Sequence, residues 1–439
     1  MHWFLSLPHG LPAVTILTFA AVVVLLGARS FGRGAVQALA LAGPLVAALP
    51  ALWLPSADTF AVTAVLATAL IGALLLCADE LEMADLRAEC AALLLLGSAG
   101  AIALASAGDL LSVLIGLETL SMAVAVLTGL GRGRRPVEAA FRFFVLAAAS
   151  VATMIYGIGL IAYATGSFEL GAAAPAPQLH DLHFAGLVLL SLGIAFELAL
   201  VPLQFGALGA YREAPMAFAG FAMTASKLAA VLALGRIAAA HPELQPLLLG
   251  LGTLSIVVAT LGGLAQRDLR GILAWSAVGH GGFLALALGC GDAGQKATIY
   301  YAVVYVGSAA LAVAALAGRR GNLPFGDART EPLGRARGIA LVAALLSLAG
   351  VPPSPGFWAK LAVLGPAWHV AGPALTIVAV LGGVIGALYY LRPVPDLIAG
   401  FRAAEPGTLP AGSRLALAMV GGLWALFTVL PELAVRLAG

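Results

Sequence analysis

The sequence predicts an all-α polytopic membrane protein of about 14 transmembrane helices. Of its 439 residues, 62% are hydrophobic and only 10% are charged, and the mean hydropathy is +1.03. Soluble domains carry about 25% charged residues. Only helices or closed barrels satisfy the backbone inside lipid, and the apolar runs here are continuous rather than alternating, which excludes a barrel.

Other function classes find no support in the sequence. The net charge of +2 is too small to suggest nucleic acid, and Cys77, Cys90 and Cys290 lack CxxC or metal spacing, so we expect free thiols. No dinucleotide, phosphate-loop, haem, zinc or iron–sulfur motif is present. We therefore expect no metal and no cofactor in this chain. No Lys or Arg precedes the first apolar run, so we expect that run to remain as a span rather than a cleaved signal.

A span needs about 20 apolar residues to cross the hydrocarbon core. Short loops separate the runs, and the longest loop, 318–337, is the candidate connector between two halves. The predicted spans lie near 10–28, 35–54, 58–78, 89–107, 109–130, 137–165, 183–203, 213–236, 246–264, 270–289, 295–318, 337–368, 371–392 and 412–435.

The basic residues predict the orientation. Of the 20 Lys and Arg in the loops or at the span edges, 17 lie in or beside loops that follow odd-numbered spans. Because cytoplasmic loops are rich in Lys and Arg, the odd loops are expected to be cytoplasmic and both termini periplasmic. The predicted location is a bacterial inner membrane.

Proline interrupts the seventh and twelfth predicted spans. Pro202 removes the donor for the Leu198 carbonyl, and Pro352 and Pro353 do the same for Leu348 and Ala349. Spans four to eight and nine to thirteen then form two five-helix units, each broken in its fourth helix, and an odd number of helices inverts the second unit. Membrane helices also often contain proline without forming such a repeat. The predicted domains are 1–88 (three helices), 89–236 (first repeat), 237–392 (second repeat) and 393–439 (C-terminal helix).

Six ionisable side chains fall inside the predicted spans, away from their ends. Each costs about 2.5–3.5 kcal/mol at mid-membrane, so together they would cost on the order of 15 kcal/mol unless they pair, meet water or titrate. A row of such groups can carry a proton. They are Glu118, Arg142, Glu197, Lys227, His280 and Lys360.

Each residue also has a structural interpretation. Glu118 and Lys227 could form an interhelical ion pair, and Arg142 could extend to the cytoplasmic interface. His280 could be a satisfied core histidine, although Gly279, Gly281 and Gly282 predict open space for water around it.

Several segments carry a family resemblance, including DLLSVLIGLETLSM, GIAFELALVPLQ, APMAFAGFAMTASKLAA, LRGILAWSAVGHGGFLALAL and LLSLAGVPPSPGFWAKLAVL. In order and spacing the chain resembles the N-type antiporter-like membrane subunit of respiratory complex I, the NADH:quinone oxidoreductase, over nearly its whole length. The GLE of the fifth span, the ATGS end of the sixth and the lysine of GFWAK favour the N type over its M and L relatives.

The resemblance implies roles for these residues. Glu118 matches the family's helix-five glutamate, Lys227 its helix-eight lysine, His280 its connecting histidine and Lys360 its terminal lysine. Arg142 stands where the family has a lysine. The implied activity is proton translocation driven by flavin, iron–sulfur and quinone chemistry in partner subunits, among them the M-type and K-type membrane subunits.

One departure bears on the mechanism. The family has a lysine on its broken seventh helix, where this chain has Glu197, and Gln204 replaces a histidine of the following loop. Two nearby carboxylates, Glu118 and Glu197, cannot both ionise cheaply. We hypothesise that Lys227 becomes the cationic partner and Glu197 the proton carrier. The alternatives are a half-channel that no longer pumps in a mainly structural subunit, and an Mrp-type cation/proton antiporter subunit.

Overall fold

The computed structural model describes residues 10–27, 33–53, 86–172, 175–319, 324–325 and 333–403, with short pieces between 414 and 425. The described residues contain helices and two isolated bridges but no strand. The helices are α2 Leu11–Gly27, α3 Arg33–Trp53, α5 Arg87–Ala105, α6 Leu110–Gly129, α7 Arg134–Thr165, α8 His180–Glu197, α9 Phe205–Glu213, α10 Met216–Phe221, α11 Lys227–Ala240, α12 Gln245–Leu264, α13 Leu269–Leu288, α14 Asp292–Leu316, α15 Arg335–Ala349, α16 Pro355–Val370, α17 Gly372–Leu391 and α18 Val394–Ala403. Short helical turns are η1 Pro177–Leu179, η2 Ala222–Ser226 and η3 Pro242–Leu244.

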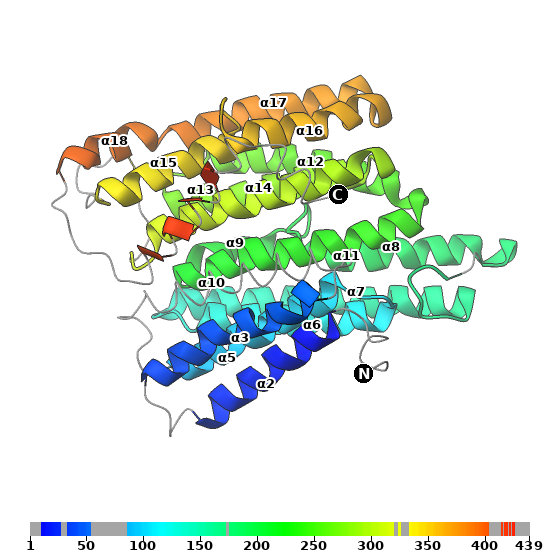
Figure 1. Ribbon diagram of the computed structural model, residues 1–439. Helices are drawn as coiled ribbons and strands as arrows, with labels where there is room; N and C mark the ends of the chain where they lie inside the picture. Colours follow the sequence, from blue (N-terminus) through cyan, green and yellow to red (C-terminus); the bar gives the residue numbers. More distant parts are fainter. Residues whose placement is uncertain are drawn as a thin grey trace.

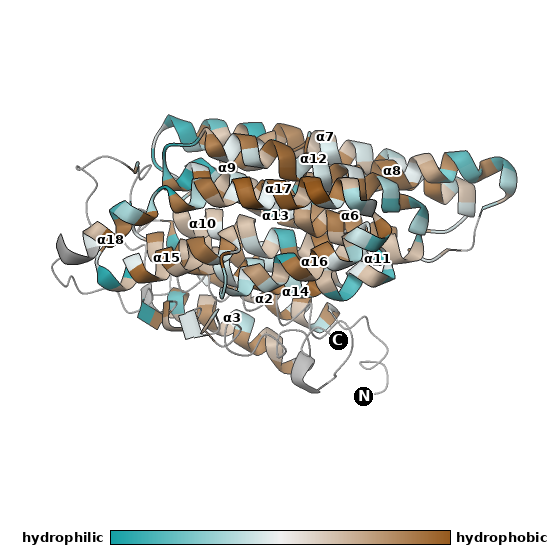
Figure 2. Ribbon diagram, turned by 90° about the horizontal axis from the view of Figure 1, so that it is seen from above, coloured by the Kyte–Doolittle hydropathy of each residue, from teal (hydrophilic) through white to brown (hydrophobic). Residues whose placement is uncertain are grey.

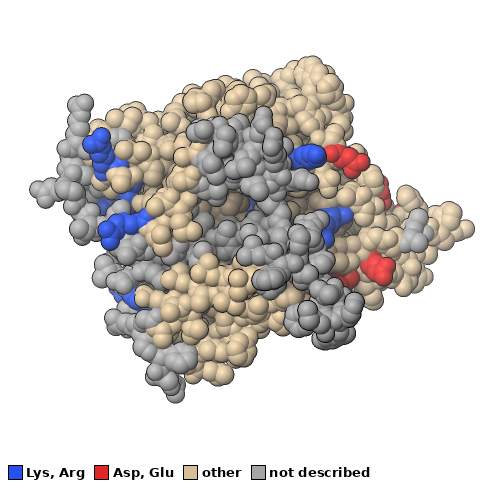
Figure 3. Space-filling view, viewed as in Figure 1, with Lys and Arg blue, Asp and Glu red and all other residues tan. Residues whose placement is uncertain are grey.

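The helices run alongside one another in an elongated bundle (Figure 1). Hydrophobic residues follow the length of the helices, and hydrophilic residues gather toward their ends (Figure 2). On the face that Figure 3 shows, basic side chains without acidic ones lie at one end, and both signs lie at the other. This distribution is what a bundle that crosses a membrane requires.

Nine helical segments in the described part of the chain are long and apolar enough to cross a membrane. They confirm the predicted spans four to eleven and thirteen, with shifted edges. Leu11–Gly27 and Ala35–Leu49 are shorter apolar helices at the first two predicted spans. The predicted third span, 58–78, lies outside the described residues, as does most of the fourteenth. The count of 14 therefore stays a prediction.

The two spans in which proline predicts a break are both interrupted. The predicted twelfth span, 337–368, is two shorter helices, α15 and α16, separated at Gly350–Ser354. The predicted seventh span ends at Glu197, and the segment expected to be a loop after Pro202 instead forms α9. Both breaks contain a cis proline bond, at Val201–Pro202 and Pro352–Pro353.

Small residues let neighbouring helices approach closely. A Cβ added to Gly116 of α6 would lie 2.4 Å from the Leu104 backbone nitrogen of α5. A Cβ added to Gly252 of α12 would lie 2.6 Å from the Leu286 nitrogen of α13. The bundle is therefore tight around the helices that carry the ionisable residues.

Aspartate caps begin two of these helices. The Asp109 carboxylate accepts from the backbone nitrogens of Leu111 and Ser112, both at 2.9 Å, and from the Ser112 hydroxyl at 2.6 Å. Partial burial raises the pKa of Asp109, but these hydrogen bonds outweigh it and hold the pKa below its usual value. Asp268 caps α13 in the same way, accepting from the Gly271 nitrogen at 2.7 Å.

Candidate functional site

The broken end of α8 carries the first group of candidate residues. Leu198 follows the last helical residue, and Ala199 adopts a φ of +56°, in the left-handed region that residues with a Cβ rarely occupy. The chain therefore turns sharply, and the Leu198 carbonyl receives no donor from Pro202. That carbonyl instead accepts a hydrogen bond from the Lys227 ammonium.

Glu197 is 4% exposed, and both of its carboxylate oxygens have a donor. Oε2 accepts from the Ser121 hydroxyl of α6 at 3.0 Å, and Oε1 accepts from the Ser226 hydroxyl. A buried carboxyl group needs such partners because an unpaired one costs far more than a hydrogen bond returns. The three helical segments that carry these residues thus converge on one carboxyl group.

Lys227 is fully buried, and its ammonium also lies 5.7 Å from the centre of the Tyr211 ring. The π-helical turn η2 immediately precedes it. Neighbouring residues on a regular α-helix point about 100° apart. Across this turn, Ser226 binds the Glu197 carboxylate, and the next residue, Lys227, binds the carbonyl of the next residue, Leu198. Such π turns are frequent at functional sites.

Gly281 of α13 allows this arrangement to pack against the second half of the chain. A Cβ added there would lie 2.5 Å from the Leu198 carbonyl oxygen and 3.4 Å from the Lys227 nitrogen. A Cβ on Gly282 would lie 2.8 Å from the Gly252 carbonyl oxygen. The expectation of open space at these two glycines is therefore wrong, because they permit close helix contact.

We expect Gly281→Ala to lower the stability of the purified protein by about 1–3 kcal/mol, because the methyl group must displace the carbonyl that Lys227 binds. Gly279→Ala is the matched control, since its Cβ would meet only the Ala259 Cβ, at 3.3 Å. Thermal unfolding in detergent measures both. Equal midpoints for the two variants would contradict the close contact.

His280 lies one residue before Gly281 and is buried among tyrosines. Its Nδ1 lies 2.7 Å from the Tyr301 hydroxyl, and its Nε2 lies 3.3 Å from the Tyr390 hydroxyl. The Tyr305 ring stacks on the imidazole with centroids 4.8 Å apart. Tyr390 in turn donates to the Ser276 hydroxyl at 2.6 Å. Both ring nitrogens therefore have a hydroxyl neighbour through which a proton can pass.

Lys360 occupies the second break as Lys227 occupies the first. Its ammonium donates to the carbonyls of Leu348 at 3.1 Å and Ala349 at 2.7 Å, the two acceptors that Pro352 and Pro353 leave without a helical donor. Gly350, at φ +79°, provides the space, because an added Cβ would lie 2.9 Å from the lysine Cδ.

A cavity of about 20 Å³ is lined by both His280 and Lys360, together with residues such as Thr260 and Tyr390. A polar cavity needs about 10–15 Å³ to hold one water molecule. One water can therefore join the histidine to the lysine. Gly279 also lines this cavity, so the space expected near the histidine exists on that side of α13.

The other two predicted residues lie apart from this group. Glu118 is half-buried on α6 and forms no ion pair with Lys227 and no hydrogen bond with Glu197 among the described contacts. It is, however, one helical turn from Ser121. Arg142 is exposed on α7, where it contacts none of the other candidates.

The hydroxyl groups of the site are not among the residues predicted from the sequence. Ser121, Ser226, Tyr301 and Tyr390 each contact Glu197 or His280. Ser226 directly precedes the buried lysine, and Ser121 follows Glu118 by one turn, which are signals available in the sequence. Nothing in the sequence marks the tyrosines, which lie on α14 and α17.

Comparison with known proteins identifies the family. Residues 107–386 match the family model described as NADH:quinone oxidoreductase/Mrp antiporter, transmembrane. The chain belongs to this family. It is similar to the NADH-quinone oxidoreductase subunit N of Cereibacter sphaeroides, with 40% identity over 334 residues, which cover 73% of this chain and 71% of the relative.

Solved structures agree with this assignment. A chain of respiratory complex I from Thermus thermophilus with bound aureothin is similar with a TM-score of 0.82 and 31% identity, covering 97% of this chain and 99% of that chain. A chain of the Mrp complex from Dietzia shares the fold, with a TM-score of 0.76 at 19% identity over 98% of this chain and 95% of that chain. The resemblance to the N type of complex I subunit is confirmed.

Proposed function

We propose that this chain is the N-type proton-translocating membrane subunit of a complex I-like NADH:quinone oxidoreductase. The observation that carries the proposal is the pair of broken helices, where the buried Lys227 and the half-buried Lys360 bind the carbonyls that proline leaves free. His280 directly precedes Gly281, which packs against Lys227, and it lines one cavity with Lys360. Membrane proteins rarely place three such groups together inside their spans unless ions or protons pass between them.

The proposed path runs from Glu197 to Lys227, past Gly281 to His280, and through one water to Lys360. In the structure the ammonium of Lys227 binds a carbonyl, and the serines hold the carboxyl group. Protonation of Glu197 would leave this arrangement stable, and its ionisation would draw Lys227 from the carbonyl to the carboxylate. Lys227 would thereby couple the charge on Glu197 to the groups beyond α13.

Glu118 belongs to the proposed path as the group before Glu197. It lies one turn from Ser121, which donates to Glu197, and residues three or four apart on a helix share a face. Because Glu118 is half-buried, it can exchange protons with groups outside the described bundle. The path does not include Arg142, whose exposed position suits an interfacial cation.

The predicted organisation, with domains 1–88, 89–236, 237–392 and 393–439, is part of the proposal. Two details support an inverted repeat of helices four to eight and nine to thirteen. Asp109 caps the fifth helix and bridges to Glu169 after the sixth, while Asp268 caps the tenth and bridges to Pro324 after the eleventh. Both termini would be periplasmic in a bacterial inner membrane.

The redox groups would belong to partner subunits, including those with flavin, iron–sulfur clusters and quinone, and the M-type and K-type subunits would be membrane neighbours. Among the described residues, no group of three or more His, Cys, Asp or Glu is arranged to hold a metal ion. The chain would act as a translocase within an enzyme.

Purification of the tagged chain from its own membranes in mild detergent, followed by mass spectrometry, tests the assembly. We expect flavin and iron–sulfur subunits in stoichiometric amounts. Recovery of the chain with only small membrane subunits, in vesicles that exchange cations for protons without NADH, would favour the Mrp-type antiporter instead.

A further inference from the structure

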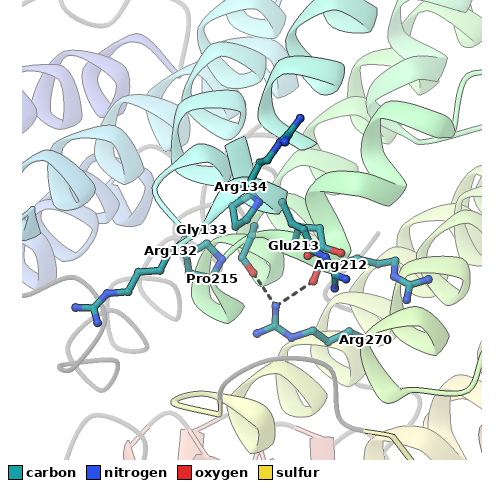
Figure 4. A pocket seen from close by; sticks show the side chains of 11 residues that line it. Arg132, Gly133, Arg134, Arg212, Glu213, Pro215 and Arg270 are labelled. Carbon is teal, nitrogen blue, oxygen red and sulfur yellow. Dashed lines mark hydrogen bonds between the residues drawn. The ribbon is translucent and has the colours of Figure 1, made fainter. Parts of the chain in front are cut away.

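A cavity of about 460 Å³ opens at the arginine-rich end of the bundle. We name it the arginine cavity. Its walls come from the turn before α7, the end of α9 and the start of α13, and Figure 4 shows it from close by. Among the described residues that line it, one is acidic, Glu213, and five are arginines: Arg132, Arg134, Arg135, Arg212 and Arg270.

Some of these arginines already have partners. Arg212 binds Asp268 at 2.9 Å, and Arg134 binds Glu138 at 2.6 Å. Arg270 lies at the floor of the cavity, where its guanidinium donates to the carbonyls of Arg212 and Ala214 at 3.1 and 2.9 Å (Figure 4). These contacts fix the wall of the cavity, and they neutralise only part of its positive charge.

Arg132 and Arg135 supply positive charge that no described partner neutralises. Both side chains are exposed, and neither has a hydrogen bond or ion pair among the described residues. In Figure 4 the side chains of Arg132 and Arg134 extend outward on different sides of the turn. Exposed side chains change rotamer within nanoseconds, so the guanidinium groups of Arg132 and Arg135 can turn toward an anion bound in the cavity. Arginine binds phosphate oxygens in a bidentate manner.

The position of the cavity indicates where such an anion comes from. Three candidate spans, Arg134–Thr165, Met216–Ala240 and Leu269–Leu288, begin at its wall. Because these apolar spans begin here, a membrane around them would place its headgroup region at the cavity. Directly below, α7 exposes a run of apolar side chains at helical spacing, which offers a surface for acyl chains: Val137, Phe141, Phe144 and Val145.

We infer that the arginine cavity binds the phosphate headgroup of an anionic phospholipid, with the acyl chains along α7. A soluble phosphate would use the guanidinium groups but not the apolar face. The inference concerns a lipid site outside the proton path, so it stands apart from the proposed redox coupling.

The test compares phosphatidylglycerol binding to the delipidated full chain by native mass spectrometry and by titration in phosphatidylcholine nanodiscs. The variant is Arg132→Ala/Arg135→Ala. The matched control is Arg267→Ala/Arg335→Ala, which removes two exposed arginines of the same end without a described side-chain partner. We expect the first variant to bind about ten-fold more weakly and the control to bind as the wild type does.

Equal thermal midpoints establish that both variants remain folded. Equal weakening in both variants would overturn the site, because binding would then follow total charge. Full competition by millimolar inorganic phosphate would identify a soluble anion as the ligand and overturn the lipid assignment. Unchanged lipid binding with loss of a partner subunit from the purified assembly would overturn it in favour of a protein contact.

Discussion

Glu197→Gln is expected to lower NADH-driven proton translocation by the reconstituted assembly about ten-fold or more, the usual loss when a proton-transferring group is removed. Glutamine keeps the shape of the side chain, and its amide can hydrogen-bond both Ser121 and Ser226, so the fold should be preserved. It cannot take up or release a proton. The measurement is the rate of dye-detected acidification in proteoliposomes, normalised to the assembled protein.

Glu138→Gln is the matched control, because that carboxylate forms an exposed pair with Arg134 far from the buried group. Ser226→Ala is expected to give an intermediate loss, since it leaves the proton carrier but removes one of its two hydroxyl partners. Unchanged proton stoichiometry in Glu197→Gln would establish that this half of the chain does not pump, which is the structural-subunit alternative.

Lys360→Met is expected to lower proton translocation by a similar factor, and it should also lower stability. The substitution removes the last cation of the proposed path, and it leaves the carbonyls of Leu348 and Ala349 without the donor that they have now. An unsatisfied buried acceptor costs about 1–3 kcal/mol. We therefore expect both a lower thermal midpoint and a loss of proton translocation.

Lys296→Met provides the control, because Lys296 is exposed on α14 and has no role in either break. Lys360→Arg separates the two effects, since guanidinium can still donate to the carbonyls but does not release a proton under physiological conditions. Wild-type pumping by Lys360→Arg would contradict a proton-carrying role for this residue.

Much of the site could be predicted from backbone chemistry. Proline at 202, 352 and 353 identifies three carbonyls without helical donors, and these are the carbonyls that Lys227 and Lys360 bind. The sequence also places Glu197, Lys227, His280 and Lys360 inside apolar runs. Hydropathy therefore predicts that they must find partners, and proline predicts some of those partners.

What could not be predicted depends on contacts between distant segments. Local sequence places Lys360 on the broken helix itself, but it does not reveal that Lys227 serves the break of the preceding helix. The π turn before Lys227 has no sequence signal that we recognised, yet it aims Ser226 and Lys227 at consecutive groups. The prediction of open space at Gly281 was wrong because the close contact exists only in the packed structure. There a Cβ added to Gly281 would lie 2.5 Å from the Leu198 carbonyl oxygen.

The proposed path carries protons from Glu197, held by Ser226, to the neighbouring Lys227 and onward to His280, driven by NADH oxidation. The most direct test is NADH-driven proton uptake in inverted membrane vesicles whose only copy of this chain carries Lys227→Met, with NADH oxidation followed in the same sample. We expect fewer protons to be taken up for each NADH oxidised. An unchanged ratio in fully assembled complex would contradict it.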